Sequence, residues 1–265
     1  METAMSYQTL DISIADKVAT VTLNRPEQRN AFNEHTIAEL ALAFDELGRN
    51  DIVRAIVLAA NGVAFCAGAD LNWMKKMAAY SLDENQADAA RLADMLHTIY
   101  LCPKPVVAKV QGDCYAGGMG LVAACDIVVA SEAANFCLSE VKLGLIPATI
   151  SPYVIKAMGE QAARRYFLTA ERFNAAEALR IGLVHESVVP EALDATVAAI
   201  VKALASNSPH AVGEAKKLVR EVVGKPVDEA LLADTANRIA AIRASDQGRE
   251  GVASFLEKRK PSWLE

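Results

Sequence analysis

Cysteine and histidine are scarce in this chain of 265 residues, which has five cysteines, four histidines and no CxxC pair. An odd number of dispersed cysteines is typical of reduced thiols in the core of a cytoplasmic protein, so we expect no disulfide framework. Zinc sites need a closely spaced set of cysteine and histidine ligands, and the sequence offers none. The sequence therefore predicts neither a disulfide-stabilised secreted domain nor a metal centre.

Long uncharged runs are also missing. Uncharged stretches such as residues 114–125 and 143–155 are well short of the roughly 20 consecutive apolar residues that a membrane-spanning helix needs. The N-terminal segment has no basic start followed by an apolar run, so it predicts no secretory signal. We therefore expect a cytoplasmic protein with no membrane partner.

Positive charge is in the minority, because 27 Lys and Arg residues against 33 Asp and Glu residues give a net charge of −6. A nucleic-acid or anionic-membrane surface needs a concentrated positive field, so we expect no nucleic-acid partner. Hydrophobic residues make up 52% of the chain. That share is enough for a sizeable core and excludes disorder for most of the chain.

Strand-like and helix-like segments alternate along the first part of the chain. Strands are predicted at residues 10–14, 18–23, 54–60, 106–110, 127–130, 135–138 and 183–188. Helices are predicted at residues 33–48 and 83–100, in a short segment ending at 125, and then at 151–158, 160–169, 174–181, 191–205, 209–223, 227–244 and 246–257. This order indicates a layered α/β core over residues 1–190 and a helical C-terminal region over residues 191–265.

Two loops rich in small residues follow predicted buried strands. One reads FCAGADL from Phe65 to Leu71, and the other reads GDCYAGGMG from Gly112 to Gly120. Neither contains GxGxxG or GxxxxGK[ST], so no nucleotide-binding fingerprint is present. Backbone N–H groups from two such loops at one sheet edge can converge on a carbonyl oxygen, and each donor is worth about 3 kcal/mol to a developing oxyanion. Tight turns and close helix packing are the alternative explanation for these glycines.

Several motifs in a fixed order carry a family resemblance. They are AFCAGADL, KPVVAKVQG, the glycine-rich helix, ACDIVVAS and CLSEVKLGLIP. Together with AARRYFLTAERFNAAEALRIGLVHE and the terminal REGVASFLEKRKPSW, they resemble the enoyl-CoA hydratase/isomerase (crotonase) superfamily over nearly the whole chain. Within it, the run SEVKLGLIPATISPYVIKAMGEQAARRYFLTAERF is most similar to bacterial 3-methylglutaconyl-CoA hydratases and isohexenylglutaconyl-CoA hydratases.

The resemblance implies an α/β fold, a crotonase-type spiral of ββα units whose helical C-terminal region completes homotrimers, often paired as hexamers. It implies an acyl-CoA thioester substrate and no separate cofactor, since coenzyme A is part of the substrate. The backbone N–H groups of Ala69 and Gly117 would hold the thioester oxygen. Lys258 would meet the coenzyme A phosphate across a subunit boundary, although a solvated helix end also explains this basic tail. The other implied substrate contacts are Ala31, Ala67, Gly68, Ala69, Asp70 and Leu71.

Glu140 is the candidate catalytic residue, because it matches a catalytic glutamate of the family and has apolar neighbours in the sequence. A partly buried glutamate can have a pKa suited to proton transfer. The other family glutamate falls on Gly120, so that carboxylate is replaced. We hypothesise that Glu140 acts alone as base and acid, and that open space beside Gly120 admits a branched or carboxylated acyl chain. A rim ion pair with Lys142 is the alternative explanation for Glu140.

Three functions remain as hypotheses. The first is a hydratase that adds water reversibly to a branched or carboxylated enoyl-CoA such as 3-methylglutaconyl-CoA, in leucine or isoprenoid-acid breakdown. The second is an enoyl-CoA delta-isomerase in which Glu140 moves one proton. The third is a non-catalytic or RNA-binding protein, against which the net charge of −6 argues. Candidates for the missing acid are Asp113, Glu84 and Tyr115, and candidate cations for a substrate carboxylate are Lys75, Lys76, Arg91 and Lys156.

Overall fold

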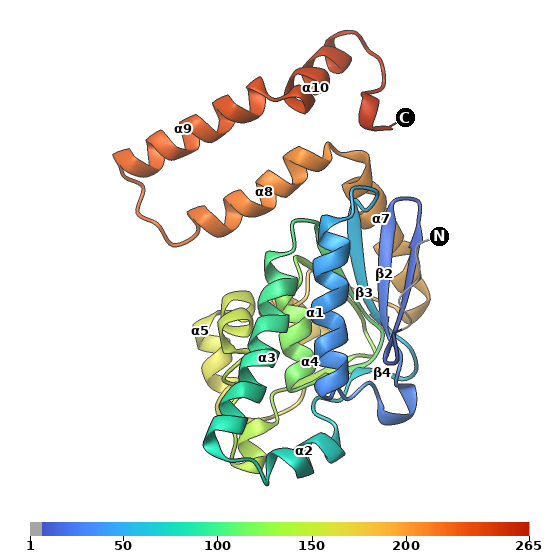
Figure 1. The fold of residues 1–265 in the computed structure, drawn as a ribbon, viewed down its shortest axis with the longest axis vertical. Helices are drawn as coiled ribbons and strands as arrows, with labels where there is room; N and C mark the ends of the chain where they lie inside the picture. Colours follow the sequence, from blue (N-terminus) through green and yellow to red (C-terminus); the bar gives the residue numbers. More distant parts are fainter. Residues whose placement is uncertain (1–6, 265) are drawn as a thin grey trace.

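The computed structural model describes residues 7–264 and contains two sheets with helices packed around them (Figure 1). The larger sheet has the order β1-β2-β3-β5-β7-β10. Its strands are Leu10–Ala15, Val18–Leu23, Ala55–Ala60, Val106–Val110, Ile127–Ser131 and Glu186–Val188. β1 pairs with β2 antiparallel, and all other pairs in this sheet are parallel. Buried parallel strands are continuously apolar, which is why the sequence AIVLAA of β3 predicts its strand correctly.

A second, smaller sheet has the order β4-β6-β8-β9. Its strands are Ala64–Cys66, Asp113–Tyr115, Asn135–Cys137 and Phe173–Asn174. β4, β6 and β8 run parallel, and β9 is antiparallel to β8. The two glycine-containing loops follow β4 and β6, which are parallel neighbours in this one sheet, so the expectation that they lie at one sheet edge is confirmed. The strands β4 and β6 themselves were not predicted. Strands this short carry too few residues to show an alternating pattern.

Helices cover the body of the molecule on both sides of the large sheet. Those preceding residue 190 are α1 (Glu34–Arg49), α2 (Leu71–Met77), α3 (Leu82–Leu101), α4 (Gly117–Ala124), α5 (Ser151–Thr169) and α6 (Ala175–Arg180). α4 lies between α3 and α5 and contacts both (Figure 1). The backbone of α5 is non-helical at Gly159, where φ is 78°, so the predicted break between two helical segments here is confirmed.

The C-terminal helices fall into two groups. α7 (Leu193–Ser206) packs on the large sheet, where Leu193 and Val197 contact Val57, Val107 and Val129. α8 (Pro209–Val222), α9 (Glu229–Ala244) and α10 (Asp246–Leu256) form an arm at the opposite end of the molecule from α2 (Figure 1). The division of the chain at residue 190 stays a prediction.

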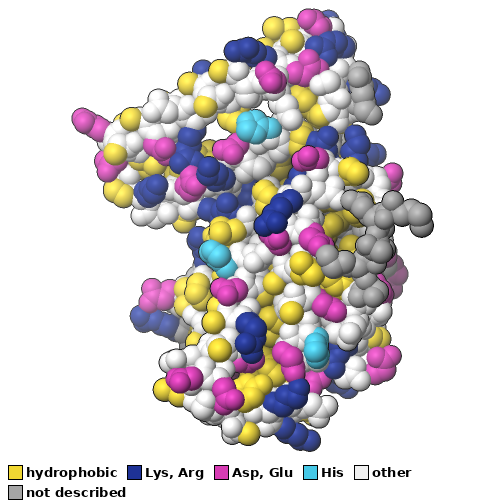
Figure 2. Space-filling model, viewed as in Figure 1, with side chains coloured by type: hydrophobic (Ala, Val, Ile, Leu, Met, Phe, Trp, Pro, Cys, Tyr) yellow, Lys and Arg dark blue, Asp and Glu magenta, His cyan; other side chains and the backbone are white. Residues whose placement is uncertain are grey.

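The arm exposes apolar side chains among its charged ones (Figure 2). The largest exposed fractions belong to Val219, Val223, Val227, Leu232, Val252, Phe255 and Leu256. A cleft of about 640 Å³ separates α8 from the body, and across it Lys216 Nζ contacts the Asp126 carboxylate at 2.6 Å. Within residues 7–264 no helix combines the length and the apolar character needed to cross a bilayer.

Candidate active site

The loops that carry the predicted site residues meet at one edge of the smaller sheet. The loop from Ala67 to Asp70 follows β4, Ala116 and Gly117 follow β6, and Glu140 lies shortly after β8. These strands are parallel neighbours, so their carboxyl ends lie on the same side. Because adjacent strands are about 4.8 Å apart, the three loops are close together in space.

The loop after β4 is fixed to the chain segment before α1. The Phe32 N–H donates to the Gly68 carbonyl at 2.9 Å, and the Asp70 N–H donates to the Phe32 carbonyl at 3.0 Å. Gly68 has a φ of 94°, a conformation that residues with a side chain rarely adopt. Ala69 lies between the two bonded residues, and its N–H has no hydrogen-bond partner in the part of the chain described. The fold therefore holds the Ala69 N–H in place and leaves it available as a donor.

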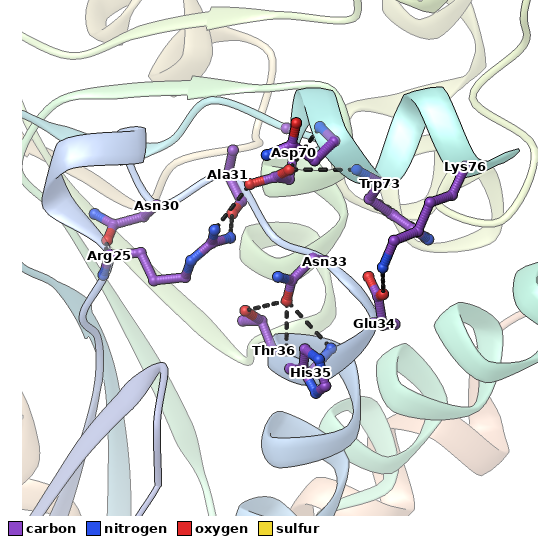
Figure 3. A network of polar contacts seen from close by, with 12 residues as sticks. Arg25, Asn30, Ala31, Asn33, Glu34, His35, Thr36, Asp70, Trp73 and Lys76 are labelled. Atoms are coloured by element: carbon purple, nitrogen blue, oxygen red, sulfur yellow. Dashed lines mark hydrogen bonds and ion pairs between the residues drawn. The ribbon is translucent and has the colours of Figure 1, made fainter. Parts of the chain in front are cut away.

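Asp70 fastens this loop through its side chain (Figure 3). Its carboxylate accepts from the N–H groups of Asn72 at 2.8 Å and Trp73 at 3.3 Å, which caps α2, and it pairs with Arg25 at 2.8 Å. Burial alone would raise the pKa of Asp70, but the bonds from Arg25 and the two N–H groups outweigh it and lower that pKa. Arg25 also donates to the Ala31 carbonyl at 2.6 Å. The Asp70 side chain thus has partners within the chain, and a substrate contact through it stays a prediction.

Gly117 supplies the second predicted donor. It is the first residue of α4, where the helix itself offers no acceptor, and its N–H has no partner among residues 7–264. The preceding Ala116 has a φ of 47° and donates its N–H to the Cys137 carbonyl at 2.8 Å. A Cβ on Gly117 would lie 2.3 Å from Cζ of Phe32, a fully buried ring. Close packing thus also requires glycine here, as the alternative explanation anticipated.

Glu140 begins a single 3₁₀ turn, Glu140–Leu143, after β8. Its side chain is half-buried, and the enclosed Oε2 has no hydrogen-bond partner among the described residues. Burial raises the pKa of Glu140, opposed only by its own backbone N–H. The proposed ion pair with Lys142 is absent from residues 7–264, so that alternative is wrong. A carboxyl group with a raised pKa can accept and return a proton at a higher pH than an exposed glutamate.

The space beside Gly120 is filled, so the expectation of open space there is wrong. A Cβ on Gly120 would lie 2.3 Å from Cγ2 of Ile150 and 3.6 Å from Cδ2 of Leu96. Both side chains are fully buried or nearly so. In the sequence Ile150 has the pattern of an ordinary core residue, and only the folded chain places it against α4. No signal in the sequence identifies this contact.

The candidates for a substitute acid have structural partners instead. Asp113 accepts from the Tyr115 hydroxyl at 2.8 Å and from Asn135 Nδ2 at 3.1 Å. Burial and the bond to Asp113 raise the pKa of Tyr115 to about 12. Glu84 accepts from the N–H and the hydroxyl of Ser81, both at 2.8 Å, in the capping box of α3. Each of these three groups thus has a partner within the chain, and its role in place of the missing glutamate stays a prediction.

The cations suggested for a substrate carboxylate are mostly engaged. Lys75 is exposed on α2 and makes no hydrogen bond or ion pair within residues 7–264. The other three have partners within the chain, namely Lys76 with Glu34, Arg91 with Asp88 and Lys156 with the Tyr100 hydroxyl.

Lys258 belongs to the C-terminal arm. It follows α10, is exposed, and therefore lies at the end of the molecule remote from α2 and its loop (Figure 1). The resemblance implies that it contacts coenzyme A in the site of another subunit. That contact stays a prediction.

Comparison with known proteins gives consistent matches over the whole chain. The family model described as enoyl-CoA hydratase/isomerase matches residues 13–265. The chain is 35% identical over 250 residues to the mevalonyl-coenzyme A hydratase sidH of Aspergillus fumigatus, covering 93% of this chain and 91% of that protein. It is 33% identical over 250 residues to the short-chain-enoyl-CoA hydratase of Clostridium acetobutylicum, covering 92% and 93%. The crystal structure of an enoyl-CoA hydratase from Shewanella pealeana superposes with a TM-score of 0.94 at 44% identity, covering 97% of this chain and 96% of that one.

Proposed function

The chain belongs to the enoyl-CoA hydratase/isomerase family, and from this premise we propose that Glu140 catalyses the reversible addition of water to an α,β-unsaturated acyl-CoA. The predicted crotonase-type α/β fold is confirmed, and the protein is an enzyme of the hydratase type. One observation carries the assignment of the site. Two backbone N–H groups, on Ala69 and Gly117, and a buried carboxyl oxygen, on Glu140, have no hydrogen-bond partner within residues 7–264 and lie at the same edge of the smaller sheet.

The two N–H groups would hold the thioester oxygen. When water attacks the β-carbon, negative charge builds on that oxygen, and each donor is worth about 3 kcal/mol to the charged state. Ala69 is fixed by the bonds of Phe32 to its neighbours, and Gly117 is fixed by the start of α4. Because these donors are already in place, the reaction needs little reorganisation of the protein.

Glu140 would act first as base and then as acid. It takes one proton from water as the oxygen bonds to the β-carbon, and it returns that proton to the α-carbon of the enolate. Its carboxyl is regenerated ionised, so a single group completes the cycle. The raised pKa supports this role, because it makes the protonated form a proton donor available nearer to neutral pH.

Isomerisation is the second candidate, and one observation favours it. Ile150 fills the position where a second acid would stand, which leaves Glu140 as the single carboxyl of the proposed pair. Moving a proton between the α- and γ-carbons requires only one such group. The two reactions differ in direction, because an isomerase creates conjugation from a 3-enoyl-CoA whereas a hydratase removes it from a 2-enoyl-CoA.

The acyl group is proposed to be branched or carboxylated, as in 3-methylglutaconyl-CoA. Two observations support this choice: the resemblance of residues 139–173 to methylglutaconyl-type hydratases, and the similarity to a mevalonyl-coenzyme A hydratase, whose named acyl group is branched. A homotrimer or hexamer is proposed from the family and is supported by the exposed apolar residues of the arm. The cytoplasmic location stays a prediction.

Turnover of a small substrate panel tests the proposal. Wild type and Glu140→Gln are supplied with crotonyl-, 3-methylcrotonyl-, 3-methylglutaconyl- and isohexenylglutaconyl-CoA, and the absorbance of the conjugated thioester is followed. We expect wild type to remove conjugation and Glu140→Gln to lose about 10²–10⁴-fold in rate, with nearly unchanged binding of the CoA ester. Normal hydration by Glu140→Gln contradicts the assignment, and a gain of conjugation from 3-enoyl-CoA identifies the isomerase.

A further inference from the structure

The side chain of Ile150 packs against α4 one helical turn beyond the proposed oxyanion donor. Gly117 and Gly120 are three residues apart on α4, so they share one face of the helix. The proposed oxyanion donor is on the first of them. Position 120 therefore faces the space one helical turn further into the body, and the nearest side chain there is Ile150.

Ile150 cannot turn away from this position easily. It precedes α5, and its carbonyl accepts from the N–H groups of Tyr153 and Val154, both at 3.1 Å. Its side chain is 2% exposed, and β-branching restricts its rotation about χ1. The atom that meets a Cβ at position 120 is Cγ2, which is attached directly to the branched carbon. Cβ of Ile150 would also lie 2.8 Å from that Cβ, so the contact depends on the backbone of residue 150 and its restricted χ1, and not on a flexible side-chain end.

Ile150 and Glu140 lie at the two ends of one segment. This segment leaves β8, makes the 3₁₀ turn, closes through the bond from the Leu145 N–H to the Glu140 carbonyl at 3.1 Å, and then enters α5. Glu140 presents a carboxyl group, while Ile150, together with Leu96 of α3, presents hydrocarbon. One end of the segment therefore places a polar carboxyl group beside α4, and the other end places an apolar side chain there.

We propose that Ile150 is a specificity-determining residue, whose side chain limits the size of the β-carbon substituent that points toward α4, such as the methyl group of a 3-methylglutaconyl chain, and makes that part of the pocket apolar. The inference rests on the proposed function, because it assumes that the thioester oxygen binds at Ala69 and Gly117. A small β-substituent such as a methyl group fits against the Ile150 side chain, and a larger one in the same position collides with Cγ2 of Ile150.

The packing part of the proposal is tested by combining substitutions at both positions. Ile150→Ala removes Cγ1, Cγ2 and Cδ1, whereas the matched control Ile150→Val removes only Cδ1 and keeps Cγ2. We expect Gly120→Ala to lower the melting temperature in wild type and in Ile150→Val, and to lower it less in Ile150→Ala, because the 2.3 Å contact with Cγ2 is removed and only the 2.8 Å contact with Cβ of residue 150 remains. An equal effect in all three backgrounds overturns the proposal.

The specificity part is tested by kcat/KM for crotonyl-CoA and cinnamoyl-CoA, which differ in a methyl or a phenyl group on the β-carbon. In Ile150→Ala the cinnamoyl-to-crotonyl ratio should rise by about 10-fold or more, and in Ile150→Val by much less, since a methylene-sized change in a pocket is worth roughly 10–200-fold. Melting curves verify that each variant is folded. An unchanged or lower ratio in folded Ile150→Ala overturns the proposal. Absence of wild-type turnover of every enoyl-CoA in the panel above instead refutes the proposed function.

Discussion

Gly117→Ala provides a sensitive test of the proposed oxyanion donor. The added Cβ would lie 2.3 Å from Cζ and 2.9 Å from Cε1 of Phe32, whereas ordinary contacts begin at 3.4 Å. Phe32 is 1% exposed and cannot swing into solvent. The ring and the start of α4 must therefore separate by about 1 Å, a shift that moves the N–H of residue 117. Alanine is otherwise favourable at a helical position, so the steric conflict decides the outcome.

The expected effect on catalysis exceeds the effect on stability. Loss of one oxyanion donor costs about 10²–10³-fold in kcat, whereas overpacking of a core costs about 1–3 kcal/mol in the free energy of unfolding. We therefore expect Gly117→Ala to fold, to melt a few degrees lower, and to lose at least about 100-fold in kcat for crotonyl-CoA with a smaller change in KM. The assay is the loss of absorbance of the conjugated thioester, with thermal unfolding measured in parallel.

The Phe32→Leu background separates displacement of the donor from general damage. Leucine lacks the Cζ atom that meets the new methyl group, so Phe32→Leu/Gly117→Ala should recover part of the lost kcat relative to Phe32→Leu alone. A Gly117→Ala protein that melts like wild type and keeps its kcat would refute the role of this N–H. An equally inactive double variant would show that the activity depends on something other than the contact with Phe32.

The remaining predictions concern a carboxyl group, an ion pair and a distant lysine. Burial raises the pKa of Glu140 in the folded state, so wild type loses stability as pH rises from the unfolded pKa of 4.5 through the folded pKa. Glu140→Gln should therefore melt at a higher temperature than wild type at pH 8, and this difference should shrink toward pH 4.5. A difference in melting temperature that does not change with pH would contradict this reasoning. Asp70→Asn leaves Arg25 without its counter-charge and should cost about 2–3 kcal/mol in urea unfolding, so a loss below about 0.5 kcal/mol would show that the pair is dispensable. Lys258→Ala should raise KM for acyl-CoA about 10-fold at low salt and leave KM for the matching acyl-pantetheine, which lacks the phosphate, unchanged; equal effects on both substrates would exclude a phosphate contact.

Much of the larger sheet could be predicted from the sequence because its strands carry an unambiguous pattern. β3 and β5 are buried on both faces and read as continuous apolar runs, and α1 shows helical spacing with Asn33 as its N-cap. In the smaller sheet only β8 was predicted, at residues 135–138, whereas β4, β6 and β9, which have two or three residues each, were missed. The stability of this sheet comes from pairing between distant segments, and no local pattern reports such pairing.

Some residues of the candidate site could likewise be predicted from the sequence, and others could not. The loops with Ala69 and Gly117 have a local signature, because small residues are needed where the backbone itself must act. Phe32 and Ile150 have none, although they determine why Gly117 and Gly120 are glycines. Their contacts form between segments far apart along the chain, so sequence reasoning led to open space beside Gly120 where the folded protein has a packed side chain.

The groups left unpaired by folding support a functional interpretation of this edge. Buried polar groups are normally hydrogen-bonded, and an unsatisfied one costs about 1–3 kcal/mol or more when charged. Around the site the chain meets this requirement closely, through the Asp70 cap, the Phe32 bridge and the bond from Ala116 to Cys137. Trp73 Nε1 and Gln111 Oε1 are also unpaired, but both groups are neutral, whereas Glu140 must desolvate a charge whenever it ionises. Nearly all polar groups of these loops are hydrogen-bonded, whereas the buried Glu140 carboxyl adds nothing to the stability of the fold. A thioester oxygen at the N–H groups of Ala69 and Gly117 and a water molecule at Glu140 would supply the missing hydrogen-bond partners. The free-energy cost of burying these groups would then be offset by hydrogen bonds to the substrate and to water.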